Sequence, residues 1–125
     1  MKLRLTILAI WTAILLAVLF APVSQIRFVS IWPFAREDKV IHFILFFITV
    51  ILVIFCTKSL WTFKTRIITG IFSGIILAAG TELIQGLIPD RSMSIFDFFA
   101  DVGGVTAGLI LYFILYSVKK IRTFI

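Results

Sequence analysis

Residues 67–108 read IITGIFSGIILAAGTELIQGLIPDRSMSIFDFFADVGGVTAG, two long apolar runs joined by a short polar turn. Glu82 lies near the end of the first run, and Asp97 and Asp101 lie at the start of the second. An ionisable residue inside a long apolar segment is costly, so it usually has a partner and a function. The pattern predicts two neighbouring membrane helices with a polar site beside their connecting turn.

The composition of the whole chain indicates a membrane protein with a single domain, residues 1–125. Hydrophobic residues make up 62% of the chain, well above the soluble average of about 45–50%. A soluble fold of this length could not bury 14 Phe and 3 Trp. The net charge of +6 does not indicate a nucleic-acid partner, because the basic residues lie between the apolar runs. Cys56 lies within an apolar run, so we expect a small buried residue and no disulfide.

Four apolar runs are long enough to cross a bilayer as helices. Each has about 17 to 24 residues, and about 1.5 Å per residue lets such a helix cover a hydrocarbon core of about 30 Å. The runs are Leu5–Ala21, Val40–Thr57, Ile67–Ile88 and Ile95–Val118. None has the alternation of a β-barrel strand. We therefore predict an all-α integral membrane protein with four transmembrane helices.

The first run also has features of a signal peptide. Lys2 and Arg4 precede it, and Ala21 ends it. The run is longer than the usual apolar core of such a peptide, and Pro22 would follow the cleavage site. We therefore expect it to be retained as a membrane span, with Trp11 at mid-span as a packing residue.

The basic residues predict the orientation, because cytoplasmic loops carry more Lys and Arg than outer loops do. With a cytoplasmic N-terminus, the inner side holds no acid and the basic residues Lys2, Arg4, Lys58, Lys64, Arg66, Lys119, Lys120 and Arg122. The outer side then holds only Arg27, Arg36, Lys39 and Arg91. Both termini are thus expected in the cytoplasm, and all six acids lie on the outer side.

In the third and fourth runs, a row of small residues lies on the same helical face as the acids. In the third run, Glu82 and Gln85 share a face with Ala78, Gly74 and Gly70. Small residues at such steps let another helix approach closely.

In the fourth run, Asp97 and Asp101 share a face with Gly104 and Gly108, and Ser94 is placed to cap the helix N-terminus. The short connection makes the third and fourth helices antiparallel neighbours. We therefore expect Glu82 to lie close to both aspartates.

Carboxylates packed together repel one another and need a positive partner. The candidates on the same side are Lys39, His42 and Arg91. A metal ion is the other option, and its candidate ligands are His42, Glu82, Asp97 and Asp101. Asp38 with Lys39 can also be read as a solvated loop pair, and Glu37 and Asp90 are interpreted as loop charges.

Three motifs occur in order along the chain. They are Asp38-Lys39-x-x-His42-Phe43, then Glu82-x-x-Gln85, and, after Arg91, Asp97-x-x-x-Asp101-x-x-Gly104-x-x-x-Gly108. Together they resemble the VanZ-like family, and the resemblance covers nearly the whole chain. It implies a small protein of the bacterial plasma membrane with a role at the cell envelope, and the name-giving member is linked to teicoplanin resistance. Asp101 stands where the family is expected to show Asn more often, which adds a negative charge to the site.

The leading functional hypothesis is an outward-facing pocket that binds a lipid-linked or cell-wall head group, with an effect on glycopeptide susceptibility. Lys39 and Arg91 would contact phosphate or carboxylate groups. The other expected pocket residues are His42, Glu82, Gln85, Asp97 and Asp101, whose side chains would accept hydrogen bonds or respond to pH.

Three alternatives stay open. The first is a membrane enzyme that uses acid–base or metal-assisted chemistry on an isoprenoid phosphate or wall precursor. The second is a polar network that only joins helices, and the third is a transporter module, although the acids leave no polar path to the cytoplasmic side. The bilayer is the expected partner, a homo-oligomer is left open, and no cofactor is assigned.

Overall fold

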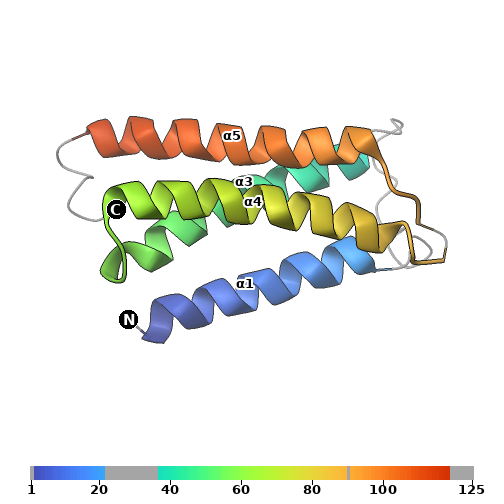
Figure 1. Cartoon of the computed structure of the whole chain (residues 1–125), viewed down its shortest axis with the longest axis horizontal. Helices are drawn as coiled ribbons and strands as arrows, with labels where there is room; N and C mark the ends of the chain where they lie inside the picture. Colours follow the sequence, from blue (N-terminus) through green and yellow to red (C-terminus); the bar gives the residue numbers. More distant parts are fainter. Residues whose placement is uncertain (1, 22–36, 90, 119–125) are drawn as a thin grey trace.

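The computed structural model describes residues 2–21, 37–89 and 91–118, and these residues form helices and short connections without any strand (Figure 1). The helices are α1 (Lys2–Phe20), α3 (Glu37–Cys56), α4 (Phe63–Gln85) and α5 (Ile95–Ser117), with the short 3-10 helix η1 (Thr57–Ser59) after α3. The four α-helices that the described residues form are each long and apolar enough to cross a membrane. The prediction of an all-α protein with four such helices is confirmed.

Several helix ends differ from the ends of the apolar runs. Helices α1, α3 and α4 begin three or four residues earlier than predicted, because polar and charged residues are accommodated in a first helical turn although they do not belong to an apolar run. Glu37, interpreted as a loop charge, and its neighbour Asp38 therefore lie in the first turn of α3.

The connection between α4 and α5 begins earlier than predicted. Helix α4 ends at Gln85 instead of Ile88, because the N–H groups of Leu87 and Ile88 bond to carbonyl oxygens three residues back, at 2.9 Å and 3.1 Å. Helix α5 starts at Ile95 as predicted, and the Ser94 hydroxyl accepts the Asp97 N–H at 3.3 Å. The predicted N-cap is confirmed.

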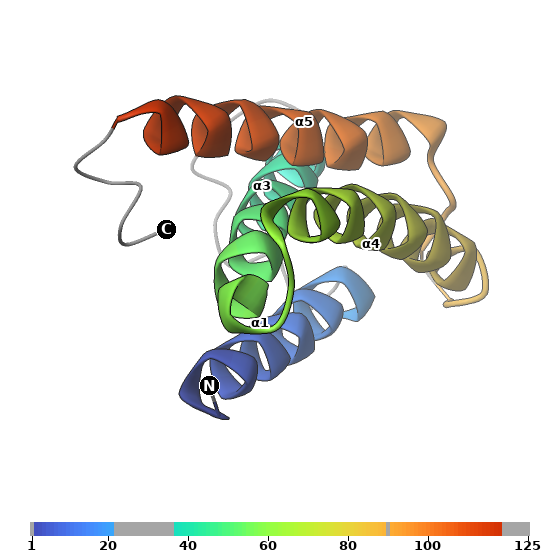
Figure 2. The ribbon, with the colours of Figure 1, turned by 60° about the vertical axis from the view of Figure 1, so that its left-hand side comes forward.

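Helix α3 packs against each of the other three long helices (Figure 2). Its fully buried residues Phe46, Val50 and Ile54 are four residues apart, so they form one row along the helix. They belong to a core completed by Leu15, Leu19, Leu45, Ala78, Val105 and Tyr112. Helix α3 is therefore the element around which the bundle is built.

The two predicted rows of small residues lie in helix interfaces, but not all at the same one. Gly74 faces α5, where an added Cβ would lie 2.6 Å from Val105 Cγ2, and Gly70 faces Ile54 of α3 at 3.0 Å. Ala78 is fully buried in the same row. The glycine row of α4 therefore packs against two neighbouring helices, α3 and α5.

On α5, the glycine row faces α3 instead of α4. A Cβ on Gly104 would overlap the carbonyl oxygen of Phe43, and one on Gly108 would lie 2.7 Å from the carbonyl oxygen of Phe47. The α3 and α5 backbones approach this closely only because no side chain stands between them.

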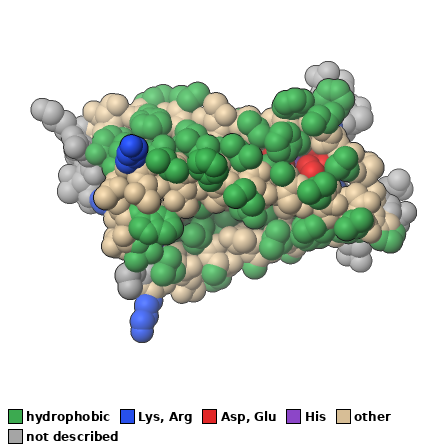
Figure 3. Space-filling model, in the orientation of Figure 1, with side chains coloured by type: hydrophobic (Ala, Val, Ile, Leu, Met, Phe, Trp, Pro, Cys, Tyr) green, Lys and Arg blue, Asp and Glu red, His purple; other side chains and the backbone are tan. Residues whose placement is uncertain are grey.

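On the face shown in Figure 3, apolar side chains lie along the bundle, and the charged side chains are seen towards the ends of the molecule. Ile76, Leu83 and Phe99 are each more than 60% exposed, and many other large apolar side chains are also exposed. Continuous exposure of this kind is unfavourable in water and fits a hydrocarbon environment.

We use the term polar end for the end of the bundle where α1 and α4 finish and α3 and α5 begin, at the right of Figure 1. The expectations for Pro22, Arg27, Arg36, Asp90, Lys119, Lys120 and Arg122 concern residues outside the described ranges.

Candidate functional site

His42 is the centre of the polar end. Its side chain has no exposed surface, although it lies in the second turn of α3, only five residues from the helix start. The Nδ1 atom lies 2.9 Å from Asp101 Oδ1 and 3.8 Å from Glu82 Oε1. The Nε2 atom lies 4.0 Å from Asp38 Oδ1. One imidazole thus contacts acidic groups from α3, α4 and α5.

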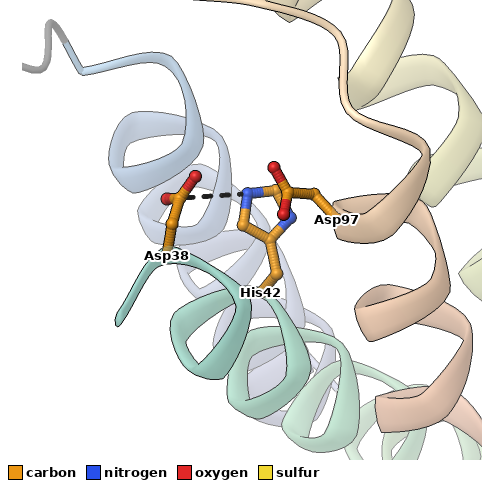
Figure 4. Close-up of side chains that lie close together, drawn as sticks. All are labelled: Asp38, His42 and Asp97. Atoms are coloured by element: carbon orange, nitrogen blue, oxygen red, sulfur yellow. Dashed lines mark ion pairs between the residues drawn. The ribbon is translucent and has the colours of Figure 1, made fainter. Parts of the chain in front are cut away.

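Asp38 and His42 from α3 and Asp97 from α5 lie close together in Figure 4, where the dashed line marks the Asp38–His42 pair. Asp38 is four residues before His42, so the two side chains share a helical face. Asp38 is 52% exposed, in contrast to the buried acids.

Glu82 joins α4 to the segment that precedes α5. Its Oε2 atom accepts the backbone N–H of Ser94 at 2.8 Å, while Oε1 points towards the imidazole. The same Ser94 caps α5 with its hydroxyl group. Ser94 therefore fixes the start of α5 relative to the end of α4 through both its backbone and its side chain.

Asp97 forms a second contact between α3 and α5, in addition to that of His42 with Asp101. Its Oδ1 atom accepts a hydrogen bond from Lys39 Nζ at 2.8 Å. Lys39 is 40% exposed and Asp97 only 8%. Asp97 also lies in the first turn of α5, where a negative charge is favoured by the helix dipole.

Arg91 and Gln85 bind the end of α1. Arg91 donates from Nε and Nη2 to the carbonyl oxygen of Ala21, at 3.2 Å and 2.8 Å, and Gln85 Nε2 donates to that of Leu19 at 2.8 Å. The last carbonyl groups of a helix have no partner within the helix. These two side chains supply partners for α1, and Arg91 Nη1 also lies 3.7 Å from Asp38.

Two sets of side chains in the described part of the chain place ligand atoms for a metal ion within 4.8 Å of one another. The first set is Asp38, His42 and Asp97, and the second is His42, Glu82 and Asp101. The first set is partly exposed, and its Asp97 already accepts a hydrogen bond from Lys39. The second set is fully buried, which makes it the more distinctive of the two.

A mostly apolar groove of about 410 Å³ leads to the polar end between α1 and α3. Its apolar lining comes from Ile14, Ala17, Val18, Leu19, Ala21 and Ile41. Asp38 and Arg91 also line it, and these are the only charged residues among the described lining residues. The groove is therefore apolar along most of its length and includes the ion pair of Asp38 and Arg91.

The structure brings together the seven expected pocket residues, but it divides them into three roles. His42, Glu82 and Asp101 form a buried set, Lys39 and Asp97 form an ion pair, and Gln85 and Arg91 bind α1. The interpretation of Asp38 with Lys39 as a solvated loop pair is wrong, because both lie in α3 and contact different partners.

Sequence reasoning missed the part that α1 plays at this end. The groups concerned are the backbone carbonyls of Leu19 and Ala21, and a carbonyl group gives no signal in the residue type. It also missed the hydrogen bond from Trp11 Nε1 to Thr49 Oγ1, 2.9 Å long, although it correctly expected Trp11 to pack.

Taken together, the fold and the site define a class: an all-helical protein with four helices able to cross a membrane and a buried histidine–carboxylate cluster at one end. No protein-family model, curated protein or solved structure matches the chain. The resemblance to the VanZ-like family therefore stays a prediction based on the motifs.

Proposed function

We propose that this protein binds a lipid-linked head group at the outer face of the bacterial plasma membrane. The observation that carries the proposal is the apolar groove between α1 and α3, which ends at Asp38 and Arg91. A hydrocarbon chain is complementary to the groove, and a polar head group is complementary to the cluster beside it. Few ligands other than a lipid combine these two chemistries.

The orientation in this proposal follows from the positive-inside rule. Arg4, Lys58, Lys64 and Arg66 lie towards the end of the bundle opposite the polar end, and the described residues place no acid there. This distribution supports cytoplasmic termini and an outward-facing cluster.

The charges favour a head group that is rich in hydrogen-bond donors. Of the described groups at the polar end, four are carboxyl groups (Asp38, Glu82, Asp97 and Asp101) and two are permanent cations, Lys39 and Arg91. Both cations already contact acids. This end therefore offers many hydrogen-bond acceptors to sugar hydroxyl or amine groups, and it offers few free cations to a phosphate.

The test is lipid capture by the purified full-length protein in mild detergent, measured by mass spectrometry of the extracted lipids. Ala17→Trp fills the groove and should abolish co-purification of the lipid. Ala13→Trp is the matched control, because Ala13 is exposed on the same helix but does not line the groove. Equal lipid content in Ala17→Trp and wild type would refute the proposal.

The proposed binding also extends to the envelope role that the motifs imply. A protein that holds a wall precursor at the outer face would alter the access of a glycopeptide to that precursor. We expect expression of the chain in a sensitive host to shift the minimal inhibitory concentration of teicoplanin, and Ala17→Trp to remove the shift. An identical shift with Ala17→Trp would show that any resistance does not depend on lipid binding.

A membrane enzyme is the second candidate, and one contact favours it. Asp101 accepts the hydrogen bond of His42 Nδ1–H when that nitrogen carries the proton, which leaves Nε2 as a base. A carboxylate that orients an imidazole in this way is common in acid–base catalysis. Release of phosphate from an isoprenyl diphosphate, lost in His42→Gln, would establish this reading, and no turnover of such substrates would exclude it.

A further inference from the structure

Three buried polar atoms at the polar end have no hydrogen-bond partner among the described residues. They are His42 Nε2, Glu82 Oε1 and Asp101 Oδ2. Their side chains are at most 5% exposed, so bulk water does not solvate them. Because buried polar groups are nearly always paired, Glu82 Oε1, which faces His42 Nδ1 beside Asp101, indicates that a ligand belongs to the cluster.

We propose that His42, Glu82 and Asp101 form a binding site for a divalent transition-metal ion. Each residue comes from a different helix, α3, α4 and α5, and the three ligand atoms lie within 4.8 Å of one another. One imidazole and two carboxylates make a ligand set that suits Zn²⁺, Mn²⁺ or Fe²⁺ better than Ca²⁺ or Mg²⁺, which prefer oxygen alone.

The distances fit this class of ion. Bonds of about 2.0–2.2 Å place neighbouring ligand atoms roughly 3.0–3.5 Å apart. The separations from His42 Nδ1 are 2.9 Å to Asp101 Oδ1 and 3.8 Å to Glu82 Oε1. Both separations are close to this range, and all three ligand atoms lie within 4.8 Å of one another.

A hydrogen-bond network alone explains the cluster less well than an ion does. The imidazole can share only one proton at Nδ1 with Asp101, and Glu82 Oε1 then still faces the ring from 3.8 Å without a hydrogen bond. When both buried carboxyl groups are ionised, a protonated imidazole balances only one of the two negative charges. A divalent cation answers both needs.

The neighbouring set of Asp38, His42 and Asp97 is the less suitable site. An ion there would have to displace Lys39 Nζ from Asp97, to which it is bonded at 2.8 Å. Asp38 is half exposed and already lies 3.7 Å from Arg91. These two aspartates therefore serve as controls for the buried set.

The metal site does not rest on the proposed lipid binding, because an ion can be measured without any lipid. It does add to that proposal. Three protein ligands leave at least one coordination position for water or for an oxygen atom of a bound head group. An anionic head group could then bind at this otherwise acidic end.

The test is metal binding to the full-length protein in mild detergent after treatment with a chelator. Zn²⁺ and Mn²⁺ are added separately, and the bound metal is measured by calorimetry and by elemental analysis after gel filtration. We expect wild type to bind a stoichiometric ion, and Glu82→Gln and Asp101→Asn to lose at least about tenfold in affinity. Asp97→Asn and Asp38→Asn should stay within about threefold of wild type.

Two results would overturn the inference: wild type that takes up neither ion, or equal affinity in all four variants. Co²⁺ binding to wild type gives a second readout that needs no variant. We expect wild type loaded with Co²⁺ to show the visible absorption bands of an ion bound by nitrogen and oxygen ligands. The absence of these bands would also contradict the site. Failure of lipid capture with intact metal binding would refute the proposed function alone.

Discussion

The substitution Gly104→Ala should separate the two most tightly packed helices. A Cβ at this position would overlap the carbonyl oxygen of Phe43 and lie 2.9 Å from the backbone nitrogen of Phe47. Backbone atoms cannot rotate aside as a flexible side chain can. Helix α5 must therefore move away from α3, and Asp101, one turn earlier on α5, would move away from His42.

The magnitude follows from two opposing terms. Ala is better than Gly inside a helix by about 0.8–1.0 kcal/mol. Overpacking an interface typically costs about 1–3 kcal/mol, and the contact with backbone atoms puts Gly104→Ala at the upper end. We expect a net loss of about 1–2 kcal/mol in the free energy of unfolding.

Gly103→Ala is the matched control because it changes the adjacent residue in the same helix. Its Cβ would lie 3.5 Å from the Phe43 ring, an ordinary van der Waals distance. This variant should keep the helix-propensity gain of up to about 1 kcal/mol. The two alanine variants should therefore differ by about 2–3 kcal/mol.

The assay is unfolding by sodium dodecyl sulfate in mixed micelles, followed by tryptophan fluorescence and circular dichroism. The midpoint should fall for Gly104→Ala and stay level or rise for Gly103→Ala. Equal midpoints for both variants would show that α3 and α5 do not pack through Gly104, and the helix arrangement described above would be refuted.

Three further predictions concern contacts between or at the ends of helices. Ser94→Ala removes the cap of α5 and should lower the free energy of unfolding by about 0.5–2 kcal/mol, whereas Ser94→Gly should cost only a few tenths; a neutral Ser94→Ala would refute the cap. Thr49→Val removes the acceptor of the Trp11 indole N–H and should cost about 0.6–1.7 kcal/mol, and no further loss should follow when Trp11→Phe is already present. A double-mutant cycle with Lys39→Met and Asp97→Asn should give a coupling of about 0.2–1 kcal/mol, since Lys39 is 40% exposed; additive effects would mean that the pair does not form.

The sequence was sufficient to predict the helices, because membrane spans depend on local composition. A run of apolar residues has to satisfy its own backbone hydrogen bonds in a bilayer, whatever its neighbours are. It was less informative about helix ends, as the early start of α3 at Glu37 shows. A first turn tolerates charges that the apolar pattern excludes.

The sequence grouped the charged and polar residues of the polar end, but it did not give their pairings. Helical spacing places Glu82 and Gln85 on one face, yet their side chains go to different neighbours, the α5 start and the α1 end. Arg66 was expected on the inner side just before the third span, but it is buried within α4 and donates to the carbonyl oxygen of Ile54 at 3.2 Å. Spacing within one helix does not say which other helix a face meets.

By itself the sequence determined that four apolar helices exist, that small residues line two of them, and that the acids gather near one turn. These features follow from composition and from the period of the helix. Only the tertiary structure decided that the α5 glycines face α3, that α1 closes the polar end, and that His42 stands between Glu82 and Asp101. The physical reason is that these contacts depend on the crossing and rotation of whole helices, which are set by packing between segments far apart in the chain.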